Sequence, residues 1–175
     1  MGVVIRSARK DDVSHLLAIY APYVRETVIS FEAQPPSEEE FASRILESHV
    51  SFVYEEAGTT QGFVYAAQFN PRAAYQWSAE VSVYLAETAK GQGIGRQLLG
   101  ALLAGLRTRG LVNAFGGIAL PNPSSVRLFE SFGFEQIALQ KKVGYKLGAW
   151  HDVGWWQLQL CEPPIPPPNL FTQHK

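Results

Sequence analysis

The stretch from residue 80 to residue 96 constrains the fold most, because it combines a strand pattern, a tight turn and a glycine-rich entry into a helix. Across residues 80–85 apolar and polar side chains alternate, which is typical of a strand. After a turn at residues 86–89, glycines occupy every second position of Lys90-Gly91-Gln92-Gly93-Ile94-Gly95-Arg96. The residues that follow predict a helix with one apolar face, made of Ile94, Leu98, Leu99, Leu102, Leu103 and Leu106.

A helix that opens on glycines leaves its first N–H groups bare, and the missing side chains let an anion approach the backbone. Lys90 and Arg96 add full positive charge on either side of this turn. The pattern fits a pyrophosphate site, but it also fits a plain tight turn before a core helix. A P-loop is excluded because no Gly-Lys-Ser/Thr ending is present, and the dinucleotide fingerprint lacks its third glycine.

The composition narrows the class of protein. With 175 residues and a mass of 19.4 kDa, the chain is expected to form one domain over residues 1–160. The 15 Lys and Arg residues balance 16 Asp and Glu residues, which leaves no basic surface typical of nucleic-acid or membrane partners. Cys161 is the single cysteine, so we expect neither a disulfide framework nor a cysteine-based metal site, and a cytoplasmic location. Residues 161–175 are proline-rich and are predicted to be an extended, dispensable tail.

The remaining patterns predict an α+β domain in which strands and helices mix without strict alternation. We expect a first strand at 3–5, a helix to about residue 24 capped by Asp11 or Asp12, and a helix over 37–49. A hairpin at 51–55 and 62–68 is followed by strands at 75–85 and 112–120. Asn122 and Pro123 predict the start of another helix. Two last strands are expected at 134–144 and 155–160, around a turn rich in glycine and tryptophan.

The glycine turn resembles the acyl-CoA signature of the GNAT family of N-acetyltransferases, Arg/Gln-x-x-Gly-x-Gly/Ala, with Lys90 in place of the usual Arg or Gln. The likeness extends from about Val4 to Leu160 and is sharper for the branch that contains phosphinothricin and methionine-sulfone acetyltransferases. The residues that carry it are Ile19-Tyr20, Thr27–Glu32, Arg72-x-x-Tyr75-x-Trp77-x-x-Glu80, Val81–Tyr84, Leu120-Pro121-Asn122, Ser125–Leu128, Gly133-Phe134 and Val143-Gly144-Tyr145-Lys146-Leu147-Gly148-x-Trp150-x-Asp152-Val153.

The resemblance implies a twisted, mostly antiparallel sheet with helices on both faces, and acetyl-CoA as co-substrate. In that fold the strand before the glycine turn diverges from the strand before Asn122, and the pantetheine arm lies in the gap. The cofactor-binding residues implied by the resemblance are Val83, Tyr84 and Leu85 through the main chain, Gly91, Gln92, Gly93, Ile94, Gly95 and Arg96 in the turn, and Asn122 and Ser125. Asn122 is alternatively a helix cap only, and the same ambiguity holds for Ser125.

Acetylation of an amine needs a neutral amine, a stabilised oxyanion and a leaving CoA thiolate. Glu80 is the candidate catalytic base, because a carboxylate is wanted at the cleft and Glu80 matches the family's proposed base. Relatives often carry Tyr or His seven positions after Asn122, whereas this chain has Phe129, which donates no proton. Tyr84 and His151 are weak candidates to replace it. No metal is expected.

For the substrate, Arg72 is suited to hold a carboxylate or phosphinate, and Phe31 and Tyr75 are candidate pocket walls. Trp77 and Trp150 are expected to belong to the core. The resulting hypothesis is an N-acetyltransferase that acts on the α-amine of a small amino acid or analogue such as phosphinothricin, methionine sulfone or sulfoximine, by direct attack on the thioester. The alternatives are a protein N-terminal acetyltransferase and a non-catalytic acyl-CoA-binding sensor. A homodimer is implied by the resemblance.

Overall fold

The computed structural model describes residues 2–170. A seven-stranded sheet forms the centre of the molecule, with the strand order β1-β2-β3-β4-β5-β7-β6. All neighbouring strands are antiparallel except β4 and β5, which are parallel. The elements follow the chain as β1 (Val3–Ser7), α1 (Val13–Glu26), α2 (Glu38–Leu46), β2 (Val50–Glu56), β3 (Thr59–Gln68), β4 (Ser78–Leu85), α3 (Ile94–Thr108), β5 (Asn113–Leu120), α4 (Pro123–Glu130), β6 (Glu135–Lys146) and β7 (Ala149–Gln159).

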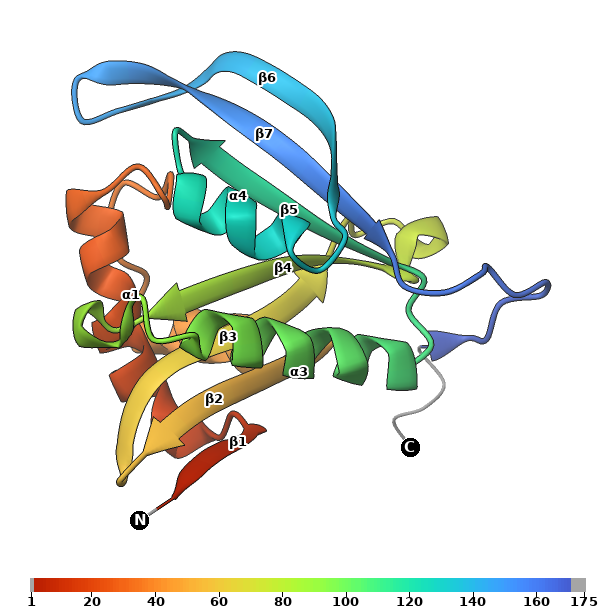
Figure 1. Cartoon of the computed structure of the whole chain (residues 1–175), viewed down its shortest axis with the longest axis horizontal. Helices are drawn as coiled ribbons and strands as arrows, with labels where there is room; N and C mark the ends of the chain where they lie inside the picture. Colours follow the sequence, from red (N-terminus) through yellow and green to blue (C-terminus); the bar gives the residue numbers. More distant parts are fainter. Residues whose placement is uncertain (1, 171–175) are drawn as a thin grey trace.

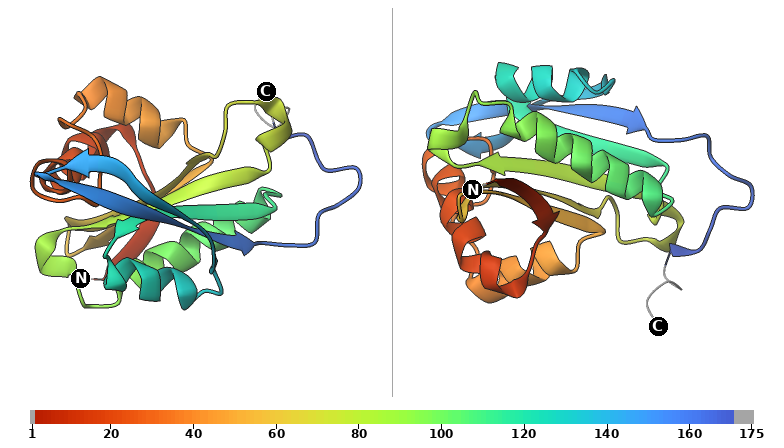
Figure 2. Two further views of the ribbon diagram at one scale, coloured as in Figure 1. Left: turned by 90° about the horizontal axis from the view of Figure 1, so that it is seen from above. Right: turned by 60° about the horizontal axis from the view of Figure 1, so that its bottom comes forward.

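Helices cover both faces of the sheet, as Figure 2 shows: α1 and α2 lie on one side, and α3 and α4 on the other. Two apolar clusters correspond to these two faces. The leucine stripe of α3 packs with Val64, Val81 and Phe129 in the larger cluster. The inward side chains of α1 and α2, including Leu16, Tyr20 and Phe41, form the smaller cluster with β2 and β3. The predicted fold class is therefore confirmed.

Several local predictions hold because the signals are short-range. Ser37 caps α2 in a capping box, in which its Oγ accepts from the Glu40 N–H at 3.2 Å and the Glu40 carboxylate accepts from the Ser37 N–H at 2.9 Å. Asn122 Oδ1 likewise accepts from the Ser125 N–H at 3.2 Å at the start of α4. The predicted side-chain cap of α1 is wrong: the Asp12 carboxylate instead binds Arg6 at 2.7 Å on both oxygens.

The last two strands are longer than predicted. β6 and β7 continue almost to the tight turn at Leu147 and Gly148, and they form a hairpin that reaches past the body of the sheet (Figure 1). The expected turn over 145–154 is wrong because alternating side chains, not the glycines, decide the conformation there. Trp150 is 61% exposed on this hairpin, so its expected place in the core is also wrong. Trp77 is half-buried.

The proline-rich segment loops away from the domain (Figure 2) and returns to it at Pro168 and Leu170. Its residues 161–169 form neither helix nor strand. The Trp77 Nε1–H donates to the Pro168 carbonyl at 2.6 Å, and the Leu170 N–H donates to Gln76 Oε1 at 3.1 Å. Leu170 also packs against the larger apolar cluster. The described part of the predicted tail thus has a defined contact with the start of β4; residues 171–175 lie outside the described residues.

Candidate active site

A short parallel ladder opens the centre of the sheet. β4 and β5 pair only where Ser78–Glu80 meets Asn113–Phe115, and beyond these positions the two strands separate. The gap is continued by a cleft of about 420 Å³, lined by residues 81–85 of β4, the glycine turn, residues 117–119 of β5 and the first turns of α4. The divergence of these two strands, expected from the resemblance, is therefore present.

Every second residue of β4 turns its main-chain N–H and C=O groups toward this cleft. The Ala86 N–H donates to the Gln61 carbonyl at 2.8 Å, so the even-numbered residues of β4 bond to β3. By alternation, Val81, Val83 and Leu85 turn their N–H and C=O groups to the cleft. Tyr84 turns its main-chain groups to β3 and lines the cleft with its side chain. Val83 and Leu85 thus have the orientation that their predicted role requires.

The glycine turn presents bare backbone at the start of α3. Gly91 and Gly93 have φ angles of +75° and +78°, which favour glycine, and a Cβ at either position would meet nothing within 4 Å. Gly93 is the N-cap of α3 and supplies no side chain to cap the first N–H groups. These groups are therefore left for a ligand anion or water, as the sequence predicts.

Both cations beside the turn are held by neighbouring residues. Lys90 Nζ pairs with the Glu87 carboxylate at 2.5 Å and lies 5.0 Å from the centre of the Tyr23 ring. Arg96 donates to Ser131 Oγ at 2.8 Å, and its guanidinium lies over the Phe132 ring. The Glu87 carboxylate therefore offsets the charge of Lys90, while the Arg96 guanidinium is held beside Ser131 and Phe132.

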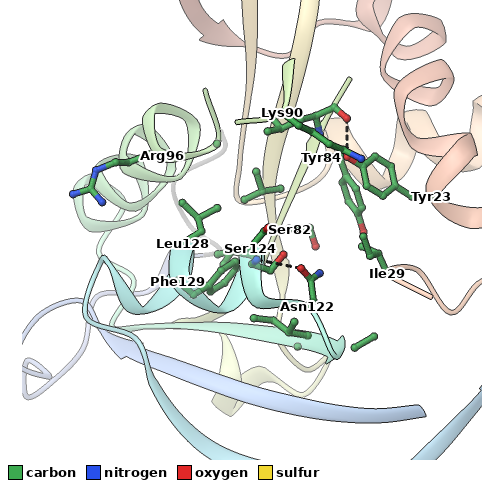
Figure 3. A pocket seen from close by; sticks show the side chains of 18 of the residues that line it. Tyr23, Ile29, Ser82, Tyr84, Lys90, Arg96, Asn122, Ser124, Leu128 and Phe129 are labelled. Atoms are coloured by element: carbon green, nitrogen blue, oxygen red, sulfur yellow. Dashed lines mark hydrogen bonds between the residues drawn. The ribbon is translucent and has the colours of Figure 1, made fainter. Parts of the chain in front are cut away.

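Figure 3 shows the two walls of the cleft: Tyr23, Tyr84 and Lys90 lie together on one side, and Leu128 and Phe129 of α4 lie across from them. The predicted cofactor-binding residues line this cleft with two exceptions. Ile94 is buried in the core, and the Gln92 side chain donates to the Thr88 carbonyl at 2.6 Å. Neither side chain faces the cleft, so only their main-chain groups are available for the predicted contact.

Glu80 occupies the last paired position of β4, where the two strands begin to separate. Its side chain lies on the face opposite Ala79 and Val81, which pack under α3. Within residues 2–170 no hydrogen bond or ion pair holds its carboxylate, and burial raises its pKa above the usual range. A carboxylate with a raised pKa accepts a proton more readily near neutral pH, which suits a general base.

An aromatic cluster stands beside Glu80 on the same face. Phe115 is the cross-strand partner of Glu80, and Phe69 stacks on it with ring centres 4.3 Å apart. The Trp155 ring meets the Phe69 ring edge-on, with ring centres 6.1 Å apart. The ring of Tyr75, a predicted pocket wall, has its centre 6.2 Å from that of Phe69. Tyr75 is therefore connected to the surroundings of Glu80 through Phe69.

The two other predicted substrate residues, like Glu80 itself, are not among the residues that line the cleft. Arg72 is exposed on the loop before β4, at the end of that strand remote from the glycine turn. Phe31 is 42% exposed and packs on Gly144 of the β6–β7 hairpin, near His151. Neither lines the cleft.

Phe129 fills the inner wall of the cleft. Its ring is buried against Gly116, where a Cβ would lie only 2.2 Å from the ring, and it meets Phe134 edge-on at 4.9 Å. Of the two side chains considered as replacements for a proton donor, Tyr84 lines the cleft. His151 does not, and its Nε2 pairs with the Lys146 carbonyl at 2.9 Å.

Tyr23 is a cleft residue that the sequence did not reveal. Tyr23 is buried on α1. The hydroxyl, however, donates to the Leu85 carbonyl at 2.7 Å and accepts from the Leu85 N–H at 3.3 Å. A buried tyrosine hydroxyl needs a hydrogen-bond partner, so a tyrosine among the apolar residues of this helix was the one sign in the sequence of such a contact.

Residues 5–155 match the model of the "Acetyltransferase (GNAT) domain". Because this match spans most of the chain, the protein belongs to the GNAT acetyltransferase family and is an N-acetyltransferase. The predicted family and enzyme class are thereby confirmed.

Particular relatives point to one branch of that family. The chain is 39% identical to the phosphinothricin N-acetyltransferase of Alcaligenes faecalis, over 89% of this chain and 82% of that protein. It is 30% identical to the L-methionine sulfoximine/L-methionine sulfone acetyltransferase of Salmonella typhimurium, over 94% and 98%. A solved phosphinothricin acetyltransferase from Sinorhizobium meliloti, in complex with acetyl-CoA, superposes with a TM-score of 0.86 at 34% identity, over 91% and 89%. These names support the predicted branch and do not favour the two alternative functions.

Within residues 2–170, no helix is long and apolar enough to cross a membrane. The same residues contain no cluster of three His, Cys, Asp or Glu side chains that could hold a metal ion.

Proposed function

We propose that this N-acetyltransferase transfers the acetyl group of acetyl-CoA to the α-amine of a small amino acid or analogue, such as phosphinothricin or methionine sulfone. The observation that carries the proposal is the open cleft between β4 and β5, with bare helix N–H groups at one end and, at the other, Val81, which directly follows Glu80 at the last paired position of β4. The names of the relatives supply the substrate class.

The chemistry follows from what each group offers. The N–H groups at the start of α3 and the two glycines with positive φ receive the pyrophosphate. Main-chain groups of Val81 and Val83 bind the pantetheine arm as an added strand would and hold the thioester next to Glu80. Glu80 takes a proton from the substrate ammonium so that the neutral amine attacks the thioester carbonyl. An N–H of the β4 edge stabilises the oxyanion.

The leaving thiolate departs without a proton from residue 129, because Phe129 has none to give. A thiol has an unperturbed pKa of about 8.5, so a thiolate leaves with little acid assistance near neutral pH.

The first test is release of CoA thiol from acetyl-CoA with a panel of phosphinothricin, methionine sulfone, methionine sulfoximine, ordinary amino acids and an N-terminal peptide. We expect saturable turnover with the small analogues and none with the peptide. Turnover with the peptide alone would replace the proposal by protein N-terminal acetylation. Acetyl-CoA binding without turnover on any acceptor would replace it by the sensor.

Arg72 is proposed to bind the substrate carboxylate or phosphinate in a forked pair. Arg72→Ala should raise KM for the amino acid substrate with little change in KM for acetyl-CoA. Arg25→Ala is the matched control, because Arg25 is an exposed arginine of α1 outside the cleft. An unchanged KM for the amino acid in Arg72→Ala would remove Arg72 from the site.

Arg72 does not line the cleft of its own chain, which is explained if the enzyme works as a homodimer that builds each site from two chains. The β6–β7 hairpin carries exposed apolar side chains that a second copy would cover: Ile137, Leu139, Val143, Tyr145, Leu147 and Trp150. Because β6 is the last strand of the sheet, its outer edge is also open.

A mixing experiment tests this shared site. Arg72→Ala and Glu80→Gln chains are unfolded together and refolded, so that about half of the dimers are mixed and each holds one intact site. We expect about a quarter of the wild-type activity from the mixture, and far less from either variant alone. A monomer in analytical ultracentrifugation, or no recovery on mixing, would contradict the shared site.

A cytoplasmic location is part of the same proposal. Its supports are the use of acetyl-CoA and the single cysteine, Cys161, which leaves no intrachain disulfide to form.

A further inference from the structure

The end of β4 is already occupied by a side chain of the protein itself. Leu85 turns its N–H and C=O to the cleft, where the proposed pantetheine site ends and the glycine turn begins. The Tyr23 hydroxyl satisfies both groups at once, donating at 2.7 Å and accepting at 3.3 Å. An amide of a bound ligand would make the same two kinds of hydrogen bond, so Tyr23 and the ligand compete for Leu85.

Tyr23 is held in this position from several sides. Its ring packs edge-on against Tyr84, with ring centres 5.2 Å apart. The Lys90 Nζ lies over the Tyr23 ring, 5.0 Å from the ring centre. The Thr27 hydroxyl donates to the Tyr23 carbonyl at 2.7 Å near the end of α1. The hydroxyl therefore meets Leu85 as part of a packed arrangement that also contacts the cation of the glycine turn.

We propose that the Tyr23 hydroxyl is an internal competitor for the cofactor at Leu85, which weakens the binding of acetyl-CoA and CoA and speeds the release of CoA after transfer. The inference rests on the proposed use of the cleft and extends it to the control of affinity. A ligand that pairs with Leu85 first displaces the hydroxyl. A ligand that does not displace it forgoes the contacts at Leu85. In both cases the hydroxyl lowers the affinity for the ligand.

Tyr23→Phe separates competition from simple support of the fold, because only competition predicts tighter binding of CoA. The ring and its contacts remain while the hydroxyl is lost. With competition, the Kd for CoA falls by about threefold to tenfold, the value of one or two ordinary hydrogen bonds. The dissociation rate of CoA falls in proportion. With a purely supporting role, the Kd rises or stays unchanged.

Tyr20→Phe is the matched control, since Tyr20 lies one turn earlier on α1 and its hydroxyl bonds to Ser30 and Glu32, away from the cleft. It should lower the melting temperature and leave the Kd for CoA unchanged. The measurements are calorimetric titration with CoA and stopped-flow displacement of CoA by excess acetyl-CoA.

Gly93→Ala distinguishes failure of this inference from failure of the proposed cleft. A Cβ at φ +78° strains the turn, so this variant should weaken CoA binding if the turn receives the pyrophosphate. Weaker binding in Gly93→Ala, with unchanged or weaker binding in Tyr23→Phe, would overturn the competition and keep the cleft. Unchanged binding in both variants would overturn both.

Discussion

Gly116→Ala is expected to destabilise the protein through a single contact in the cleft wall. A Cβ at residue 116 would lie 2.2 Å from Phe129 Cε1, 2.7 Å from Cδ1 and 3.1 Å from Cζ. The ring must therefore retreat by roughly 1.3–1.8 Å to reach an ordinary contact distance of about 3.5–4.0 Å. Phe134 meets the Phe129 ring edge-on at 4.9 Å, which limits that retreat. Overpacking of this kind costs about 1–3 kcal/mol.

The assay is thermal unfolding combined with steady-state kinetics. For a chain of this size, 1 kcal/mol corresponds to a change in Tm of about 2–4 °C. Because Phe129 also lines the cleft, we expect KM for acetyl-CoA to rise as the ring is pushed toward it. Gly100→Ala is the matched control. Gly100 lies within α3, and a Cβ there would meet the Phe132 ring at an ordinary contact distance of 3.5 Å. This control should stabilise the protein by about 0.5–1 kcal/mol.

A second substitution tests the cause. Phe129→Leu removes the ring atoms that the new Cβ would touch, so the double variant should be more stable than the sum of the two single effects predicts. Strict additivity, or a Gly116→Ala protein as stable as the wild type, would refute the account of the cleft wall.

Three further predictions concern charges and the C-terminal segment. Glu80→Gln should lower kcat by about a hundredfold or more and abolish the acid limb of the pH–rate profile, and a normal profile at full activity would exclude Glu80 as the base. Burial raises the pKa of Glu80 in the folded state, so ionisation of Glu80 costs stability as pH rises through that pKa. The variant should therefore be more stable than the wild type at pH 8 and lose this advantage near pH 4. Asp12→Asn should lower the free energy of unfolding by about 2 kcal/mol at pH 7, because the Arg6 guanidinium binds the Asp12 carboxyl and lowers its pKa. The difference in stability from the wild type should disappear as pH falls below about 4 and through the lowered pKa. A difference that does not change with pH in urea unfolding would contradict this account. Trp77→Phe removes the hydrogen bond to Pro168 and should make the segment after Leu160 more sensitive to limited proteolysis, whereas an unchanged cleavage rate would mean that this bond does not hold the segment.

The parts of the fold that the sequence predicted depend on neighbours in the chain. The glycine turn, the leucine stripe of α3 and the cap at Asn122 each rest on a few adjacent residues, and each is present. The length of the β6–β7 hairpin was missed because Gly144 and Gly148 suggested an early turn, while pairing across the two strands carries Tyr145 and Trp150 into the ladder. Local signals do not contain that pairing.

The site was predicted unevenly for the same reason. Nearly all residues expected around the cofactor line one cleft, since the turn and the strand before it are contiguous. Arg72 and Phe31 were predicted from their side-chain chemistry, which gives no position in space, and neither lines the cleft. Tyr23 lies 62 positions from its partner Leu85, and no short-range pattern links two residues so far apart.

The three-residue ladder between β4 and β5 also bears on aggregation. Open strand edges usually lie at the margin of a sheet, where another chain can pair with them. Here a second pair of open edges lies inside the sheet, between the glycine turn and the first turns of α4. A foreign strand would have to enter between these walls, past Tyr23 and Phe129. The protein can thus carry unpaired backbone at its centre, and within residues 2–170 the outermost strands β1 and β6 are the edges at the margins of the sheet.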